Sequence, residues 1–317
     1  MIRRLALFAP VLSVLVACQS SAGGSGAATT SASSSLALAL RPLGQGSIYL
    51  VLGDPGSGAI WRVDIGQKRA QQLTHPQPQY GVSWLDASPA GLVASDASSG
   101  VDVTAVYRDG RMVPVAGHGY TPAISPEGDV AYVFIPDIVG GTGPQEWRIM
   151  LIPQAGGPER VLYSQSAPDL NTVDMVDLQW GPSNRLAVIS APGDRNGSGG
   201  TPKVLVLGAD GKVEQSIQPA FGDIASIAWG GNAPGIAVAG MTQSVLVALD
   251  GRQVAIPRTW WPMCWSPKGD ALLMRRDGLH LGLWRPANPS EVEALPPLPP
   301  EMNMGGCSWL EAPATGA

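Results

Sequence analysis

The chain is poor in the residues from which catalytic and metal sites are usually built. Among its 317 residues are only three histidines, His75, His118 and His280, and three cysteines. The histidines show no spacing of metal ligands, and no Gly-x-Ser-x-Gly motif lies near them. The sequence therefore selects no catalytic residue, no metal ion and no cofactor, and an enzyme is the less favoured interpretation.

The N-terminus lacks an apolar run long enough to span a membrane. Leu5 to Val16 supplies about 12 residues, too few for a hydrocarbon core of ~30 Å at ~1.5 Å per residue. Arg3 and Arg4 precede this run and Leu15-Val16-Ala17-Cys18 ends it, as in a secretory leader with a lipobox. The arrangement resembles that of bacterial lipoproteins. The resemblance implies a signal peptide over residues 1–17 and a lipid on the Cys18 thiol; the alternative is a leader that is neither cleaved nor lipidated.

The segment after Cys18 lacks charge and large apolar side chains. Residues 19–35 are almost wholly Ser, Ala, Gly and Thr, a composition that cannot bury enough surface to fold. We therefore expect residues 18–44 to form a flexible tether, with an end-to-end distance of about 25–30 Å. Lipid and tether together predict an extracytoplasmic protein held at the cell membrane or the outer membrane.

Charged residues make up only 14% of the chain, and the basic ones form no run. Removal of the leader with Arg3 and Arg4 leaves 18 basic against 25 acidic residues, a net charge of about −7. An acidic protein without a Lys/Arg cluster lacks the electrostatic footprint of nucleic-acid binding. Because no basic patch can hold anionic lipid either, we expect the N-terminal lipid to be the membrane contact.

Long amphipathic helical patterns are also missing. Between residues 45 and 317, short runs of Val, Ile and Leu are broken by turn residues, and the chain contains 40 glycines and 29 prolines. No long stretch has apolar residues at positions i, i+3, i+4 and i+7. The pattern is typical of an all-β domain.

A repeat centred on tryptophan indicates which all-β fold this is. Counted from the Trp, or from Ile124 in the second copy, successive copies are 40, 56, 49, 36 and 44 residues apart, the lengths of four-stranded propeller blades. The copies are Ser83-Trp84-Leu85, Ala123-Ile124-Ser125-Pro126-Glu127-Gly128-Asp129, Gln179-Trp180-Gly181-Pro182, Ala228-Trp229-Gly230-Gly231, Cys264-Trp265-Ser266-Pro267-Lys268-Gly269-Asp270 and Ser308-Trp309-Leu310. We expect each Trp to pack between neighbouring blades.

The last copy ends soon after Trp309, so its inner strand needs three outer strands from elsewhere. Ser47 to Gly53, Ala59 to Asp64 and Gln71 to Thr74 can supply them, because they precede the first copy. Such closure removes the open sheet edges. We predict a six-bladed β-propeller closed by N-terminal strands that pair with the C-terminal inner strand; a seventh blade would need a hidden unit in the 56-residue gap.

Two copies, Trp265-Ser266-Pro267-Lys268-Gly269-Asp270 and Ile124-Ser125-Pro126-Glu127-Gly128-Asp129, match a known signature. They resemble the TolB-type, WD40-like propeller repeat, and similar propellers occur in actinobacterial lipoproteins of the LpqB kind. The likeness covers residues 45–317, although only two of six copies carry the full motif. The resemblance implies a propeller in the cell envelope, without the additional domains found in those families.

The cysteines become an even set once Cys18 is assigned to lipid. Cys264 and Cys307 then remain, one and two residues before the Trp of adjacent blades. A disulfide between them would pin the blade that closes the ring. A one-residue difference in register leaves two buried free thiols as the alternative.

Aromatic residues precede several copies of the repeat. Tyr80, Tyr120 and Trp261 stand four residues before the Trp position of blades one, two and five, and Trp260 and Phe221 lie near such positions. In a propeller these segments surround the mouth of the central funnel. The five aromatics are candidates for a ligand-binding rim, with packing between blades as the alternative.

One loop offers a weak calcium site. Asp194, Asn196 and Ser198 place oxygen ligands at alternating positions before a glycine. The twelfth position of an EF-hand loop would be Leu205, which has no carboxylate, so the EF-hand interpretation fails. A looser propeller-type site and a plain hairpin loop remain as alternatives.

The remaining acidic residues give no catalytic signal. Asp169, Asp174 and Asp177 cluster before the Trp of the third blade, where we expect them on a solvated loop as surface charge. The leading hypothesis is a monomeric, membrane-anchored binding platform for an envelope protein or a cell-wall ligand. The alternative is an extracytoplasmic hydrolase, lyase or cyclotransferase with its site in the funnel, because propellers host many functions.

Overall fold

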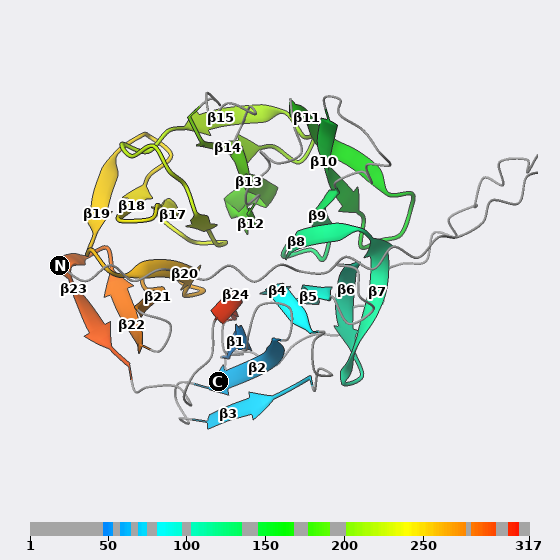
Figure 1. The fold of residues 1–317 in the computed structure, drawn as a ribbon, viewed down its shortest axis with the longest axis horizontal. Helices are drawn as coiled ribbons and strands as arrows, with labels where there is room; N and C mark the ends of the chain where they lie inside the picture. Colours follow the sequence, from blue (N-terminus) through cyan, green and yellow to red (C-terminus); the bar gives the residue numbers. More distant parts are fainter. Residues whose placement is uncertain are drawn as a thin grey trace, which may run out of the picture. The chain divides into compact units, whose positions relative to one another are not determined.

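The structure is a computed structural model, and it describes residues 47–52, 58–64, 69–74, 81–96, 103–134, 145–167, 177–190, 201–276, 280–295 and 304–310. These residues form six antiparallel sheets of four strands each, arranged as the blades of a ring (Figure 1). The six-bladed, all-β propeller predicted from the sequence is confirmed.

Within each blade the first strand in the following lists is innermost. Blade 1 comprises β4 (Val82–Ser88), β5 (Gly91–Asp96), β6 (Val103–Arg108) and β7 (Arg111–Gly117). Blade 2 comprises β8 (Gly119–Ile124), β9 (Val130–Phe134), β10 (Gln145–Ile152) and β11 (Arg160–Ala167). Blade 3 comprises β12 (Leu178–Gly181), β13 (Arg185–Ser190), β14 (Lys203–Leu207) and β15 (Val213–Ile217), with a short 3-10 turn at Pro182–Asn184.

The remaining blades follow the same order. Blade 4 comprises β16 (Ser226–Ala228), β17 (Ile236–Ala239), β18 (Ser244–Val247) and β19 (Gln253–Ile256). Blade 5 comprises β20 (Trp261–Trp265), β21 (Leu272–Arg276), β22 (His280–Arg285) and β23 (Asn288–Ala294). Blade 6 combines β24 (Met304–Trp309) with β1 (Ile48–Leu52), β2 (Ala59–Asp64) and β3 (Arg69–Gln72). No helix among the described residues is long and apolar enough to cross a membrane.

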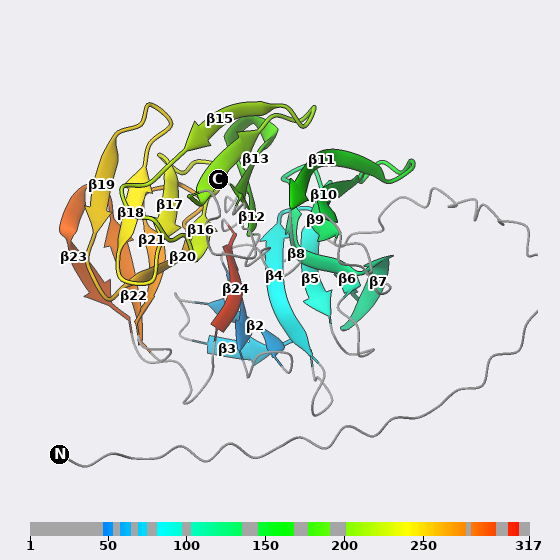
Figure 2. The ribbon, with the colours of Figure 1, turned by 45° about the horizontal axis from the view of Figure 1, so that its top comes forward.

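The two ends of the chain close the ring in blade 6, as the sequence predicts. β1 pairs antiparallel with β24, with Ile48 opposite Trp309, and the Leu310 amide donates to the Ser47 carbonyl at 3.0 Å. Figure 2 shows β24 beside β4 of blade 1 and next to the N-terminal strands of its own blade. A Cβ on Gly306 would lie 2.2 Å from the Leu85 carbonyl oxygen, so only glycine lets β24 approach β4 this closely. The ring is therefore closed by strands that are distant in the sequence.

The tryptophans of the repeat pack between blades. The Trp229 ring lies over Gly181 of the preceding blade, where an added Cβ would be 2.2–2.5 Å from three ring atoms. Trp265 is buried one blade further on, and its Nε1 donates to the Ala228 carbonyl at 3.1 Å. The glycine after the Trp of blade 3 is thus explained by the Trp of the next blade.

The Ser-Pro-x-Gly segments form the tight turns expected of them. In blade 5 the Gly269 amide donates to the Ser266 carbonyl at 2.8 Å, and Gly269 has φ +70°. In blade 2 the Gly128 amide donates to Ser125 at 2.9 Å, and Gly128 has φ +97°. These backbone angles lie in the region that favours glycine, which explains the last residue of the motif.

The repeat of blade 1 lies three residues later than the sequence reading placed it. Ser88-Pro89-Ala90-Gly91 forms the turn between β4 and β5, so Ala87 occupies the position that Trp265 has in blade 5. Trp84 is therefore not the equivalent of the other tryptophans. This copy of the repeat has alanine in place of the Trp and a shortened turn, so its sequence resembles the other copies only at Ser-Pro-x-Gly.

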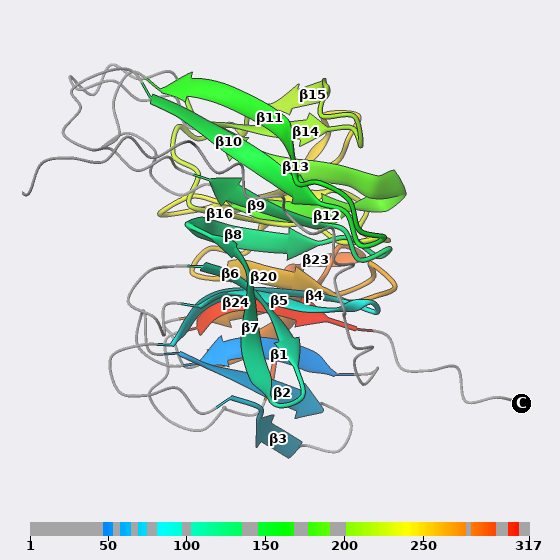
Figure 3. The same cartoon turned by 90° about the vertical axis from the view of Figure 1, so that its right-hand side faces the viewer.

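The two faces of the ring differ in their connections. Figure 3 views the blades edge on, with their strands running from one face to the other. At the face where the inner strands end, no connection between described strands exceeds seven residues, whereas at the opposite face the longest spans residues 191–202. We call these the turn face and the loop face. Because Ser47 bonds to Leu310, the propeller begins and ends at the turn face.

Candidate functional site: two cavities on the propeller axis

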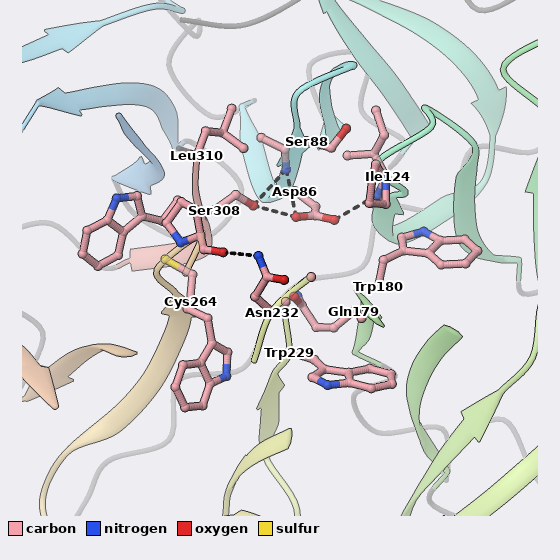
Figure 4. Close-up of a pocket in the computed structure, with 18 of the residues that line it drawn as sticks. Asp86, Ser88, Ile124, Gln179, Trp180, Trp229, Asn232, Cys264, Ser308 and Leu310 are labelled. Atoms are coloured by element: carbon pink, nitrogen blue, oxygen red, sulfur yellow. Dashed lines mark hydrogen bonds between the residues drawn. The ribbon is translucent and has the colours of Figure 1, made fainter. Parts of the chain in front are cut away.

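Two cavities lie where the inner strands of the blades converge. The turn-face cavity has a volume of about 240 Å³ and the loop-face cavity about 390 Å³. Gln179 and Cys307 line both, so the two cavities adjoin at these residues. Figure 4 shows the turn-face cavity, to which all six blades contribute residues.

Asp86 dominates the turn-face cavity. Its carboxylate accepts hydrogen bonds from the Ser308 hydroxyl at 2.6 Å, the Ile124 amide at 2.9 Å and the Ala87 amide at 2.8 Å (Figure 4). These partners belong to blades 6, 2 and 1, so one side chain links three inner strands beside the closure of the ring. Burial raises the pKa of Asp86 to about 6, although the three hydrogen bonds oppose this.

The prediction that Asp177 lies on a solvated loop as surface charge is wrong. It lies just before β12, is only 4% exposed, and accepts a hydrogen bond from the Ile227 amide of blade 4 at 2.9 Å. Burial raises the pKa of Asp177 to about 7; bonds from Ile227 and Gln179 lower it, and the charge of Asp86 raises it further. The carboxylate is buried because the neighbouring blade covers it, which no local pattern reveals. Asp169 and Asp174 lie outside the described residues.

The loop-face cavity is lined mainly by large apolar side chains. Trp84, Met241, Trp261 and Met263 contribute from blades 1, 4 and 5, and Met241 is 63% exposed. Arg275 also lines the cavity, and its guanidinium lies over the Trp261 ring, with Cζ 5.4 Å from the ring centroid. Burial lowers the pKa of Arg275, since the cation is partly removed from water.

The structure describes four of the five candidate rim aromatics and does not bring these four together at one cavity. Of these five, Trp261 lines the loop-face cavity, whereas Phe221 is 6% exposed and Trp260 packs against the same core cluster of blades 3 to 5. Tyr120 packs against the core of blades 2 and 3. Tyr80 lies outside the described residues. Packing between and within blades therefore accounts for Phe221, Trp260 and Tyr120.

Trp84 is the cavity residue that sequence reasoning missed. It was assigned to packing between blades, yet it lies beside the loop-face cavity because the repeat of blade 1 is shifted. The strand register shifts between Val82 and Trp84 and again between Pro262 and Cys264, so both strands depart from regular alternation at this mouth. The overlooked signal is Ser88-Pro89-Ala90-Gly91, which fixes the true register of β4.

Cys264 and Cys307 lie on β20 and β24, the inner strands of adjacent blades. Their Cα atoms are 5.5 Å apart and their sulfur atoms are joined in a disulfide. The Cα separation is within the usual range for such a bond. The pair lines the turn-face cavity and ties the strand that closes the ring to its neighbour.

The remaining candidates are the lipidated cysteine, the calcium ligands and the histidines, and most of them lie outside the described residues. Cys18 and the calcium candidates Asp194, Asn196 and Ser198 lie outside the described residues, as does His75. His118 lies between β7 and β8, and His280 begins β22 in blade 5. In the described part of the chain, no group of three or more His, Cys, Asp or Glu side chains could hold a metal ion.

Each cavity contains one ionisable side chain among the described residues, Asp86 at the turn face and Arg275 at the loop face. Asp86 is engaged by three hydrogen bonds within the fold. The loop-face cavity, with its aromatic walls and its single cation among the described residues, has the composition of a ligand-binding pocket.

Solved structures with a similar fold include proteins named TolB. TolB from Acinetobacter baumannii superposes with a TM-score of 0.62 at 13% identity, over 84% of this chain and 67% of that one. A putative TolB from Agrobacterium tumefaciens gives 0.51 at 17% identity, over 80% and 89% of the two chains. A protein of unknown function from Bacteroides caccae gives 0.50 at 15% identity, over 84% and 98%. At these identities the likeness concerns the fold alone.

No protein-family model matches the sequence, and no curated protein matches it.

Proposed function

We propose that this protein is a lipid-anchored, extracytoplasmic binding platform whose propeller holds an envelope protein or a cell-wall ligand at its loop face. The observation that carries the proposal is the loop-face cavity, which combines Trp84, Trp261 and Met241 with one cation and no second ionisable group among the described residues. Met241 is large, apolar and 63% exposed at this mouth. An exposed apolar group beside a cavity is typical of an interaction site.

The position of the chain ends supports this choice of face. Ser47, where the propeller begins, bonds to Leu310 at the turn face, on the opposite side of the ring from Met241 and Trp261. A tether over residues 18–44 would therefore join the turn face. The loop face would be left accessible, and the similar fold of TolB structures is compatible with an envelope setting.

The anchor is tested by replacing the lipidated residue. In the expressing bacterium, Cys18→Ser should move the protein from the membrane fraction to the soluble extracytoplasmic fraction, because no basic patch substitutes for the lipid. Metabolic labelling with a fatty-acid analogue should mark the wild type only. Equal membrane retention of both proteins, with no label on either, would refute the lipid anchor.

The binding face is tested by photocrosslinking in intact cells. A photoreactive residue at Met241 should form a crosslink that Trp261→Ala weakens, whereas the same residue at Lys268, exposed on the turn face, should form none. Circular dichroism of each variant checks that the propeller remains folded. Crosslinks of equal yield at both positions, or none at Met241, would contradict the proposed face.

A further inference from the structure

We propose that the loop-face cavity binds a neutral small molecule with an apolar, ring-sized body and one uncharged hydrogen-bonding group. The body would pack against Trp84 and Trp261, and the polar group would bond to the side-chain amide of Gln179. This inference rests on the proposed binding role of the loop face and specifies the chemistry of its ligand.

The apolar part of the ligand follows from the walls of the cavity. Trp84 and Trp261 come from blades 1 and 5, and Met241, Met263 and Ile227 add to the apolar lining. A volume of about 390 Å³ lies within the range of ~300–1,000 Å³ found for small-molecule sites. Removing an aromatic or aliphatic body from water into such a cavity is favourable.

The polar part of the ligand follows from the placement of Gln179. This residue lies in β12, the inner strand of blade 3, and is only 6% exposed. It lines both cavities, so the small part of it that the protein leaves uncovered faces them. Gln179 therefore lies at the end of the loop-face cavity that adjoins the turn-face cavity. A ligand that enters from the loop face meets this side chain at the inner end.

The amide of Gln179 has hydrogen-bonding capacity left for a ligand. Its side chain donates to the Asp177 carboxylate, which uses one N–H. A glutamine amide has two N–H donors and a carbonyl oxygen. Among the described residues, neither the second N–H nor the carbonyl oxygen of Gln179 has a hydrogen-bond partner. A buried amide that lacks part of its hydrogen bonds is unfavourable, and a carbonyl, amide or hydroxyl group of the ligand would supply the missing bond.

The ligand should be uncharged, because the ionisable groups near the cavity are already engaged in the fold. Arg275 is the one ionisable side chain that lines the cavity in the described part of the chain. It lies over the Trp261 ring and has a further interaction within the protein. Asp86, in the adjoining cavity, accepts three hydrogen bonds. A charged group that entered the loop-face cavity would lose its hydration without gaining a free counter-charge, which is unfavourable.

Blade 3 supplies a matched control for the proposed hydrogen bond. Gln215 lies in β15 of the same blade and is half-buried, and its Nε2 donates to the Leu249 carbonyl at 2.7 Å. Gln215 is not among the described residues that line the two cavities. The two glutamines share a blade and a residue type, but only Gln179 can reach a ligand in the loop-face cavity.

The experiment measures the binding of four probes that share one two-ring body to the purified full-length protein, by equilibrium dialysis. The probes are naphthalene-2-carboxamide, naphthalene-2-carboxylate, 2-naphthylmethylammonium and 2-methylnaphthalene. We expect the carboxamide to bind at least about tenfold more tightly than either charged probe. Gln179→Met should weaken the carboxamide by about three- to tenfold and leave methylnaphthalene within about twofold. Trp261→Ala should weaken both of these probes alike, and Gln215→Met should change neither.

Several results would overturn the inference. It fails if the carboxamide does not bind, if either charged probe binds as tightly, or if Gln215→Met lowers carboxamide affinity as much as Gln179→Met. Methylnaphthalene binding and thermal unfolding show whether each variant is folded. If Gln179→Met does not fold, Gln179→Asn takes its place, since it keeps an amide that is one methylene shorter, and it should weaken the carboxamide selectively too. The measurement needs neither a membrane nor a partner protein, so its failure is separate from failure of the Cys18→Ser and crosslinking tests.

Discussion

Replacement of Asp86 by asparagine should change how the stability of the propeller depends on pH. In the folded protein burial raises the pKa of Asp86 from 3.8 to about 6. Below about pH 4 the carboxyl group is protonated in both the folded and the unfolded states. Between pH 4 and pH 6 the unfolded chain releases this proton while the folded protein retains it, so the free energy of unfolding falls as the pH rises.

The size of the effect follows from the two pKa values. A difference of about 2 pKa units between folded and unfolded states corresponds to ~3 kcal/mol, lost between about pH 4 and pH 6 and constant above it. Asp86→Asn keeps an acceptor for the Ile124 amide and cannot ionise. The stability of the variant relative to the wild type should therefore rise by ~3 kcal/mol from pH 4 to pH 8. Since the charge of Asp86 raises the pKa of Asp177, part of the gain should come from Asp177.

Urea unfolding curves measured at several pH values test this prediction. Asp270 is a matched control, because it accepts a hydrogen bond from the Ser266 hydroxyl at the same 2.6 Å but is exposed. That bond lowers the pKa of Asp270 below its ordinary value of 3.8, so its contribution has the opposite sign, develops below about pH 4 and is constant from pH 4 to pH 8. Parallel stability curves for the wild type and Asp86→Asn from pH 4 to pH 8 would refute the reasoning.

Two further predictions concern the packing and the closure of the ring. Gly181→Ala should lower the free energy of unfolding by ~1–3 kcal/mol, because the new Cβ would lie 2.2–2.5 Å from the Trp229 ring. Gly222→Ala, with nothing within 4 Å, should change it by less than ~0.5 kcal/mol in the same denaturation assay. Loss of the Cys264–Cys307 disulfide, which spans a separation of 43 residues, should cost ~2–4 kcal/mol. A reductant should therefore lower the Tm of the wild type but not that of the Cys264→Ser/Cys307→Ser variant. A wild-type Tm that is the same with and without reductant would contradict this prediction about the disulfide.

Much of the fold could be predicted because its signals are local. The strands over Ala59–Asp64 and Arg185–Ser190 follow from short apolar runs between turn residues, and the turns at Gly128 and Gly269 follow from Ser-Pro-x-Gly. Closure through β1 follows from counting strands, since a terminal inner strand without partners requires them from the other end. These inferences needed only spacing and turn chemistry.

The candidate site could be predicted only in part, because it is built by contacts between blades. Trp261 was recognised as a rim candidate, but Phe221 has the same chemistry and is packed in the core. Trp84 and Trp229 are both tryptophans, but Trp229 packs between blades, whereas a shift in the register of β4 places Trp84 beside the loop-face cavity. The type of a side chain does not reveal which face of a twisted strand it occupies.

The sequence by itself determined the repeat and the number of blades, since these depend on residues that are near one another in the chain. It also determined the way in which the ring closes, since counting the strands leaves the last inner strand without partners except at the other end of the chain. Only the tertiary structure decided that Asp177 is buried, that Asp86 links three blades, and that Arg275 and Trp84 meet at one cavity. The physical reason is that burial and pKa depend on which strand of the next blade covers a side chain. That contact is made between residues far apart in the sequence, and it exists only once the ring has closed.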